Sequence, residues 1–255
     1  MTGARVAIVT GAARNIGRAI ALQLAKDGLH VALNDVAPAQ GRLDKLRREI
    51  EEGGGKAITV PADVTSEPAV KRMIDQTAAH FGALDVMVAN AGLFVWKKLL
   101  DTTVEDWHRL HGVNGLGVFL CYKHAALKMK EIGSRSGRII GAASGAGRLG
   151  VPMGAVYCQT KFGVRGLTQA LAQDLASTGI TVNCYCPGWV DTDMVREQVE
   201  ASGDVAAFYA EAKARTPVGY LGQPEDVANV VSFLVSPKAH YITGQVDVNG
   251  GLIMN

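Results

Sequence analysis

The sequence lacks the marks of a membrane protein and of a nucleic-acid-binding protein. Its longest apolar stretches, such as residues 227–235, contain polar residues and end well before the roughly 18 positions that a membrane span needs. Its 26 basic and 24 acidic residues leave a formal net charge of only +2 over 255 residues. We therefore expect neither a membrane nor a nucleic acid as a partner.

Signals for export and for metal binding are also missing. The N-terminal residues show no charged region followed by an apolar core and a cleavage site, which favours a cytoplasmic location. The four cysteines form no C-x-x-C pair and have no suitably spaced histidines, so we expect no metal site and four reduced packing residues. Cys184 and Cys186 alternate along an apolar run and should face the same side of a strand.

No repeat, low-complexity segment or linker divides the chain, so we expect one domain over residues 1–255. Short apolar runs alternate with longer stretches of helical period. Strands are predicted at residues 5–9, 30–34, 57–60, 84–89, 137–141, 181–185 and 245–248. Helices are predicted at residues 16–27, 40–52, 67–81, 104–130, 155–177 and 224–234. This pattern indicates an α/β fold with a doubly wound parallel sheet of about seven strands and helices on both faces.

One long segment departs from this alternation. Residues 191–222 are helix-prone and lie between the last two predicted strands. Long segments of this kind often cover active sites. We therefore expect a substrate lid here.

A glycine-rich turn follows the first predicted strand. Residues 10–17 read Thr-Gly-Ala-Ala-Arg-Asn-Ile-Gly and lead directly into a helix. Gly11 and Gly17 permit a tight turn and close approach of phosphates, and a helix N-terminus favours their negative charge. The order of strand, turn and helix predicts a Rossmann-type dinucleotide site.

Two charged residues bear on which dinucleotide binds. Asp35 ends the second predicted strand, where a carboxylate can accept hydrogen bonds from the adenosine ribose hydroxyls and repel a 2′-phosphate. Arg14 lies in the glycine turn, where its cation could bind such a phosphate. We expect NAD as the cofactor, with NADP as the alternative.

A second group of residues points to proton transfer. Tyr157 and Lys161 are four residues apart at the start of a predicted helix, so their side chains share one face. A nearby cation stabilises phenolate, which predicts a lowered pKa for the Tyr157 phenol. Ser144 follows the fifth predicted strand in a run of small residues, where its hydroxyl can orient a carbonyl oxygen.

Taken together, these motifs resemble those of the short-chain dehydrogenase/reductase family over essentially the whole chain. The matching segments are residues 10–17, Asn90-Ala91-Gly92, Asn114, Ser144, Tyr157 with Lys161, and residues 187–192. The resemblance implies an oxidoreductase that interconverts a carbonyl and an alcohol, with no metal. The implied catalytic residues are Asn114, Ser144, Tyr157 and Lys161. The implied cofactor residues are Gly11, Arg14, Asn15, Ile16, Gly17, Asp35, Asp63, Val64, Asn90, Ala91, Gly92, Tyr157, Lys161, Pro187, Gly188, Val190 and Thr192.

The resemblance also assigns roles. Tyr157 would be the general acid in reduction and the base in oxidation, while Ser144 holds the reacting oxygen. Lys161 would bind the nicotinamide ribose, and Asn114 would hold a water that passes protons to solvent. Asp63 would contact the adenine, Asn90 would border the adenosine, and Val190 and Thr192 would contact the carboxamide.

Two positions depart from the family pattern. Asn15 stands where the family usually has its second glycine, next to the pyrophosphate. Asparagine tolerates left-handed backbone better than other non-glycine residues, so we expect weakened cofactor binding at worst. Ala89 replaces the first asparagine of the usual Asn-Asn-Ala-Gly run, which we expect to matter little because Asn90 remains.

The predicted substrate residues are mostly apolar, which suits a small ketone, diketone or hydroxyketone. They are Phe94, Trp96, Ala146, Gly147, Met153, Trp189 and Met194. Residues 180–188 and 249–255 are similar to those of acetoin/diacetyl reductases, also called 2,3-butanediol dehydrogenases. Polyol dehydrogenases and 3-oxoacyl carrier-protein reductases are the alternatives.

Two other classes of function, a nucleotide-sensing module and a serine hydrolase, fit the sequence less well. A nucleotide-sensing module on the same fold would have lost its catalytic residues, which are intact here. Hydrolysis through Ser144 lacks a G-x-S-x-G elbow and partner residues. We also expect a homotetramer, as in many family members, formed through the predicted helices 104–130 and 155–177 and the C-terminal segment. Small residues would allow close helix packing there, namely Ala170, Ala172 and Ala176.

Overall fold

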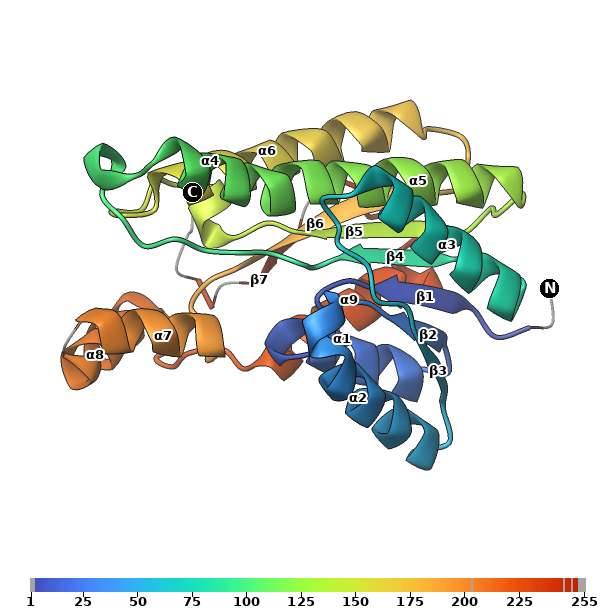
Figure 1. Cartoon of the computed structure of the whole chain (residues 1–255), viewed down its shortest axis with the longest axis horizontal. Helices are drawn as coiled ribbons and strands as arrows, with labels where there is room; N and C mark the ends of the chain where they lie inside the picture. The colour runs from blue at the N-terminus through green and yellow to red at the C-terminus, as the bar shows by residue number, and fades with distance from the viewer. Residues whose placement is uncertain (1–2, 203, 245, 249, 252–255) are drawn as a thin grey trace.

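The chain forms a parallel sheet with helices packed on both faces (Figure 1). The computed structural model describes residues 3–202, 204–244, 246–248 and 250–251. Within these residues, seven strands pair in the order β3-β2-β1-β4-β5-β6-β7, and every pairing is parallel. This confirms the predicted single-domain, doubly wound α/β fold.

The predicted strands are all present. They are β1 (Val6–Val9), β2 (His30–Leu33), β3 (Lys56–Thr59), β4 (Val86–Ala89), β5 (Arg138–Ala142), β6 (Thr181–Pro187) and β7 (Val246–Val248). Their ends differ from the predicted ends by at most two residues. Gln245, the predicted start of the last strand, lies outside the described residues.

The helices begin and end near their predicted signals, although α6 ends at Asp174, three residues before the predicted end. They are α1 (Asn15–Lys26), α2 (Gln40–Glu52), α3 (Glu67–Phe81), α4 (Val104–Leu110), α5 (Val118–Glu131), α6 (Ala155–Asp174), α7 (Asp193–Ser202), α8 (Val205–Arg215) and α9 (Pro224–Val235). Pro224 begins α9, where the Asp226 carboxylate accepts a hydrogen bond of 2.7 Å from the backbone N–H of Gln223. Gly53 follows the last residue of α2.

One helix prediction needs correction. The expected continuous helix over residues 104–130 is interrupted by a π-helical segment, His111–Gly117, between α4 and α5. Three of its seven residues are glycines, which disfavour regular α-helix. Gly117 also has no room for a side chain, because a Cβ there would lie 2.8 Å from the Val64 side chain. The wider turn accommodates this close approach.

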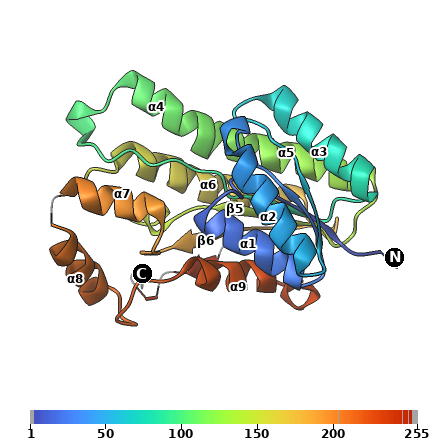
Figure 2. The same ribbon diagram turned by 60° about the horizontal axis from the view of Figure 1, so that its bottom comes forward.

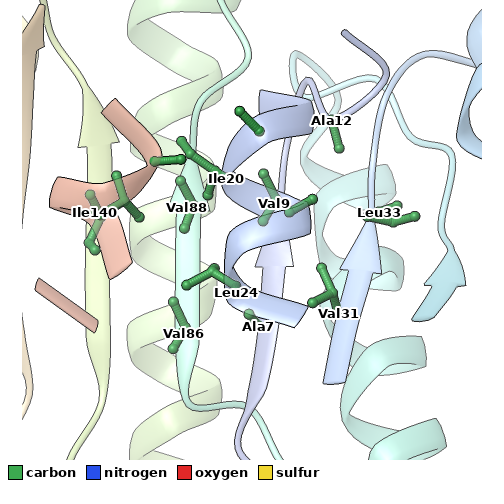
Figure 3. Close-up of a cluster of buried hydrophobic side chains, with 14 of the residues drawn as sticks. Ala7, Val9, Ala12, Ile20, Leu24, Val31, Leu33, Val86, Val88 and Ile140 are labelled. Carbon is green, nitrogen blue, oxygen red and sulfur yellow. The ribbon is translucent and has the colours of Figure 1, made fainter. Parts of the chain in front are cut away.

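Alternating strand residues supply two cores, one on each face of the sheet. Val9, Val31 and Val88 face α1, where Ile20 and Leu24 have no exposed surface (Figure 3). Burying each such aliphatic side chain stabilises the fold by about 1.5–3 kcal/mol. Helices α2 and α9 complete this layer, while α3, α5 and α6 cover the opposite face.

The four cysteines all lie in the described part of the chain, where each is a buried thiol without a disulfide bond. Cys184 and Cys186 belong to the core under α3, α5 and α6, whereas Tyr185 between them faces the other side of the sheet. This confirms the predicted alternation along β6. Among the described helices, none has the length and apolar character to span a bilayer.

Helices α7 and α8 lie apart from the two helical layers, beyond one end of the sheet (Figure 1, Figure 2). Both fall within residues 191–222, the segment that we expected to be a lid. The two ends of this segment are joined, because Val190 pairs with Gly222 as an isolated parallel bridge. The backbone N–H of Asp191 also donates to the Gly222 oxygen at 2.9 Å.

Candidate active site

A cleft of about 800 Å³ lies at the carboxyl ends of the central strands. Its walls include residues that directly follow β1, β2, β4 and β5, together with the last residues of β6. Strands β1 and β4 are neighbours in the sheet although β2 and β3 separate them in sequence. Open α/β sheets bind nucleotides at such a reversal of strand order.

The predicted cofactor residues all line this one cleft. They are Gly11, Arg14, Asn15, Ile16, Gly17, Asp35, Asp63, Val64, Asn90, Ala91, Gly92, Tyr157, Lys161, Pro187, Gly188, Val190 and Thr192. Further lining residues were not identified from the sequence, among them Asn34, Arg42, Leu93 and Tyr185.

The turn between β1 and α1 explains its glycines. Gly11 has a φ of 65°, and a Cβ at this position would lie 2.9 Å from the Ala91 Cα. A Cβ at Gly17 would overlap the carbonyl oxygen of Gly11. Helix α1 has no side-chain cap and no acidic residue in its first turn. Its N-terminal N–H groups can therefore bind an anion such as a pyrophosphate.

Asn90 fixes this turn to the end of β4. Its Nδ2 donates to the backbone oxygens of Thr10 at 2.8 Å and Gly11 at 3.3 Å. Its Oδ1 accepts a hydrogen bond of 2.8 Å from the Tyr185 hydroxyl. Tyr185 therefore holds the loop after β4 from β6, a role that the sequence analysis missed. The alternation of residues along β6 could have shown this, because it places Tyr185 on the opposite face of the sheet from Cys184 and Cys186.

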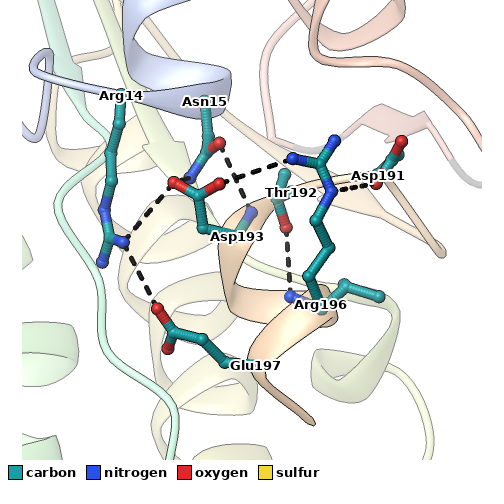
Figure 4. Close-up of polar contacts among 8 residues, drawn as sticks. Arg14, Asn15, Asp191, Thr192, Asp193, Arg196 and Glu197 are labelled. Atoms are coloured by element: carbon teal, nitrogen blue, oxygen red, sulfur yellow. Dashed lines mark hydrogen bonds and ion pairs between the residues drawn. The ribbon is translucent and has the colours of Figure 1, made fainter. Parts of the chain in front are cut away.

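The two charged residues that bear on cofactor choice both lie at the glycine turn. The Asp35 carboxylate accepts hydrogen bonds from the backbone N–H groups of Ala13 at 3.2 Å and Val36 at 2.8 Å. The Arg14 guanidinium lies 3.6 Å from the carboxylates of both Asp193 and Glu197 on α7 (Figure 4). Arg14, the cation that could bind a 2′-phosphate, is therefore paired with these two acids.

The three chemical residues meet at the other end of the cleft. Ser144, Tyr157 and Lys161 all line it, and the Ser144 hydroxyl lies close enough to the Tyr157 phenol to affect its pKa. The Lys161 ammonium is 5.4 Å from the centre of the Tyr157 ring. It donates a hydrogen bond of 2.8 Å to the backbone oxygen of Ala142 at the end of β5.

The acidities of these groups differ from the sequence-based expectation. Burial raises the pKa of the Tyr157 phenol to about 12, and the neighbouring Ser144 hydroxyl only partly opposes this. The predicted lowering by Lys161 was wrong for the protein alone, since that ammonium bonds to Ala142 instead of the phenol. Burial also lowers the pKa of Lys161 to about 8.

Asn114 supports the site from behind the cleft wall. It is fully buried in the π-helical segment, where its Oδ1 accepts from the backbone N–H of Leu93 at 2.8 Å. Its Nδ2 donates to the Leu93 oxygen at 2.8 Å and to the Thr160 hydroxyl at 3.2 Å. The side chain thus joins the loop after β4 to α6, the helix that carries Tyr157 and Lys161. Its implied role in holding a water stays a prediction.

Aromatic residues flank the phenol. Phe94 meets the Tyr157 ring edge-on with centroids 4.6 Å apart, and Trp96 lies 5.5 Å from Phe94. Trp189 packs against Phe208 of α8 at 5.1 Å. Ala146 and Met194 also line the cleft, as predicted.

Two predicted substrate residues are placed elsewhere. Met153 is not among the lining residues; it has a φ of 57°, and its backbone oxygen accepts a hydrogen bond of 2.9 Å from the N–H of Lys97. Gly147 packs against α6, where a Cβ would lie 2.7 Å from the Lys161 oxygen. Residues of α8, including Phe208, were missed because no motif marks them.

Comparisons with known proteins agree with this geometry. A family model described as enoyl-(acyl carrier protein) reductase matches residues 11–252. A short-chain dehydrogenase/reductase from Armillaria gallica is 46% identical over 253 residues, which cover 98% of this chain and 97% of the relative. An L-2,3-butanediol dehydrogenase from Corynebacterium glutamicum is 41% identical over 258 residues, which cover 98% and 99% of the two chains.

Solved structures share the fold. The crystal structure of a short-chain dehydrogenase from Burkholderia cenocepacia in complex with NADP has a TM-score of 0.88 and 34% identity, and the match covers 98% of both chains. The glycine turn, the Asn90 loop and the Ser144, Tyr157 and Lys161 group thus occur in a chain that matches its relatives over nearly their whole lengths. The chain is an oxidoreductase that belongs to the short-chain dehydrogenase/reductase family.

Proposed function

We propose that this chain transfers a hydride between NAD(H) and a small ketone or secondary alcohol. The observation that carries the proposal is that Ser144, Tyr157 and buried Lys161 line the same cleft as the glycine turn. In the nicotinamide cofactor, the ring accepts or donates the hydride when bound. The uncapped N-terminus of α1 and the absence of space for a side chain at Gly17 fit its pyrophosphate.

The side chains then divide the proton chemistry. In reduction, Tyr157 donates its hydroxyl proton to the substrate oxygen, and Ser144 holds that oxygen by a hydrogen bond. The raised pKa of Tyr157 keeps the phenol protonated, as this acid role requires. In oxidation, the Tyr157 phenolate accepts the proton of the substrate hydroxyl, with the Lys161 ammonium 5.4 Å from the centre of its ring. Asn114 bonds to Thr160 of α6 and to Leu93 in the loop after β4, and it thereby holds the helix that carries Tyr157 and Lys161 against this loop.

NAD is the favoured cofactor on electrostatic grounds. Asp35 lies where the ribose hydroxyls are expected, and its carboxylate would repel a 2′-phosphate. Arg14 is engaged by two acids of α7. Arg42 also lines the cleft, and its cation would favour the 2′-phosphate of NADP. The first experiment therefore compares NADH with NADPH.

The apolar and aromatic lining of the cleft favours a substrate that has no charged group next to its carbonyl. Phe94, Trp96 and Trp189 all line the cleft, and Phe94 contacts the Tyr157 ring. The similarity to an L-2,3-butanediol dehydrogenase supports diacetyl, acetoin or 2,3-butanediol as substrates. Sugar-derived ketoses and an acyl thioester represent the alternative subfamilies.

The test follows the absorbance of reduced nicotinamide, with NADH and NADPH in parallel. The panel contains diacetyl, acetoin, small ketoses and an acetoacetyl thioester. We expect NADH oxidation with diacetyl or acetoin and a loss of at least about 100-fold in Tyr157→Phe, because the proton donor is removed. NADH binding by the variant, followed by fluorescence, controls for folding. Failure of every carbonyl with a bound cofactor would contradict the proposal.

We also propose that the chain assembles as a homotetramer through α5 and α6. Large apolar side chains stand exposed on these helices, including Phe119 at 42%, Leu127 at 55% and Phe162 at 43%. Leu116, Phe119 and Leu127 recur at helical spacing along one face. A second copy of the same face is the occupant that would bury them.

A further inference from the structure

Helices α7 and α8 form one wall of the cofactor cleft. Met194 and Val195 of α7 and Phe208 and Ala212 of α8 line it. The segment that carries them begins and ends at one point, the bridge between Val190 and Gly222. The last part of the segment is also bonded to the C-terminal residues, because the backbone N–H of Val218 donates to the Gly250 oxygen at 3.2 Å. Helix α7, in the first part of the segment, needs an attachment of its own to stay against the cleft.

That attachment is made by the glycine turn. The Asn15 Nδ2 donates to the Asp193 carboxylate at 3.1 Å, and the backbone N–H of Asp193 donates to the Asn15 Oδ1 at 3.4 Å (Figure 4). Asn15 thus binds both the side chain and the backbone of the first residue of α7. Arg14 adds ion pairs of 3.6 Å to Asp193 and Glu197.

Neighbouring charges hold Asp193 in place for this contact. Arg196 donates from Nε to the Asp191 carboxylate at 3.0 Å, and its NH1 lies 3.7 Å from the other oxygen of Asp193. Asp193 therefore has cationic neighbours on two sides. The ion pairs are half-exposed, so each contributes little by itself, and the two hydrogen bonds of Asn15 give the contact its geometry.

The backbone conformation at residue 15 explains why asparagine can occupy this position. Its φ of 49° lies in the left-handed region, which glycine adopts without strain. Asparagine tolerates this region better than most residues, and it supplies one donor and one acceptor that glycine lacks. Aspartate in its place would bring a carboxylate against that of Asp193.

We propose that Asn15 is a positioning residue that fastens α7 to the pyrophosphate turn, so that the cleft opens and the cofactor leaves only when this contact breaks. The contact involves Asn15 and Asp193, with support from Arg14. The claim that this contact retains the cofactor rests on the proposed function. The claim that it attaches residues 191–222 to the glycine turn does not.

The attachment is tested on the protein without cofactor, by hydrogen exchange of residues 191–222. We expect Asn15→Gly, Asn15→Asp and Asp193→Ala each to speed exchange in this segment by roughly tenfold, because one hydrogen-bonded contact to a charged group is lost. The double variant Asn15→Gly with Asp193→Ala should exchange no faster than Asp193→Ala alone, because both substitutions remove the same contact. Glu49→Gln, which breaks the ion pair with Arg18 of α1, is the matched control and should leave the segment unchanged.

Retention is tested by stopped-flow dissociation of NADH. We expect NADH to leave Asn15→Gly roughly tenfold faster than the natural protein, and Glu49→Gln to behave as the natural protein. Unchanged exchange in the Asn15 and Asp193 variants would overturn the attachment. Faster exchange with an unchanged dissociation rate would overturn the link to the cofactor. Failure of the natural protein to bind NADH would instead count against the proposed function, and the exchange result would still decide the attachment.

Discussion

Lys161 illustrates how a single charged residue can lower the stability of the fold that it serves. Its side chain is only 3% exposed, and its ammonium has a backbone oxygen, that of Ala142, as a hydrogen-bond partner at 2.8 Å. Burial lowers its pKa from 10.5 to about 8. In the protein without cofactor, the protonated lysine therefore destabilises the folded state relative to the unfolded state.

The sign of the resulting pH dependence is fixed by this shift. Below about pH 8 the lysine is protonated in both states, and the folded state carries the full cost of the buried charge. As the pH rises from about 8 to 10.5, the folded state releases the proton first and the cost disappears. We expect the natural protein to gain about 3 kcal/mol relative to Lys161→Met across this window, measured by urea unfolding.

An exposed lysine provides the control for this experiment. Lys45 lies on the exposed face of α2, and Lys45→Met should show no comparable change between the two pH values. If the natural protein and Lys161→Met follow the same pH curve, the lysine is not held at a lowered pKa.

At the same scale, the sequence identified which residues carry the chemistry but not how they interact. Spacing alone brought Tyr157 and Lys161 to one helix face. That the ammonium bonds to Ala142, and that Arg14 pairs with acids of α7, depends on contacts between residues 19 and about 180 positions apart. A single sequence contains no local signal for such contacts.

Among the elements, the turn between β1 and α1 has the least room for change. A Cβ at Gly17 would overlap the Gly11 oxygen and lie 2.5 Å from the Asn90 Nδ2, so the turn would separate from the loop after β4. We expect Gly17→Ala to reduce NADH affinity at least about tenfold and to lower stability by about 1–3 kcal/mol. Fluorescence titration and urea unfolding measure the two effects.

Gly41 is the matched control for this substitution. It lies in α2, and a Cβ there would meet no atom within 4 Å. Gly41→Ala should stabilise the helix by about 0.5–1 kcal/mol and leave NADH affinity unchanged. Equal NADH affinity in both alanine variants would show that the close approach at Gly17 is dispensable.

The elements also show where periodicity is informative and where it is not. The strands were predicted well because each is a short apolar run bounded by turn residues. The π-helical segment His111–Gly117 was read as ordinary helix, since its apolar positions continue the pattern of α4 and α5. A widened turn depends on what packs against it, here the side chain of Val64 against Gly117. Only its three glycines hinted at the break.

For the whole molecule, the exposed apolar side chains on one helical layer bear on whether copies of the chain associate. Trp107 of α4 donates a hydrogen bond of 3.2 Å to Gln159 of α6, which places these helices side by side. Together with α5 they form the layer that carries Phe119 and Phe162 (Figure 1). Scattered exposed apolar residues are common, but a stripe along adjoining helices favours association.

We therefore expect a tetramer for the natural protein by light scattering coupled to size exclusion. The double variant Phe119→Glu with Phe162→Glu should elute as dimer or monomer, because facing copies would bring buried carboxylates together. Val205→Glu is the control, since Val205 is 47% exposed on α8, away from this layer. A monomeric natural protein would overturn the assembly itself. A tetramer that survives the double variant would place the contact on another face, and in that case the apolar side chains of α5 and α6 would be exposed in solution without a partner.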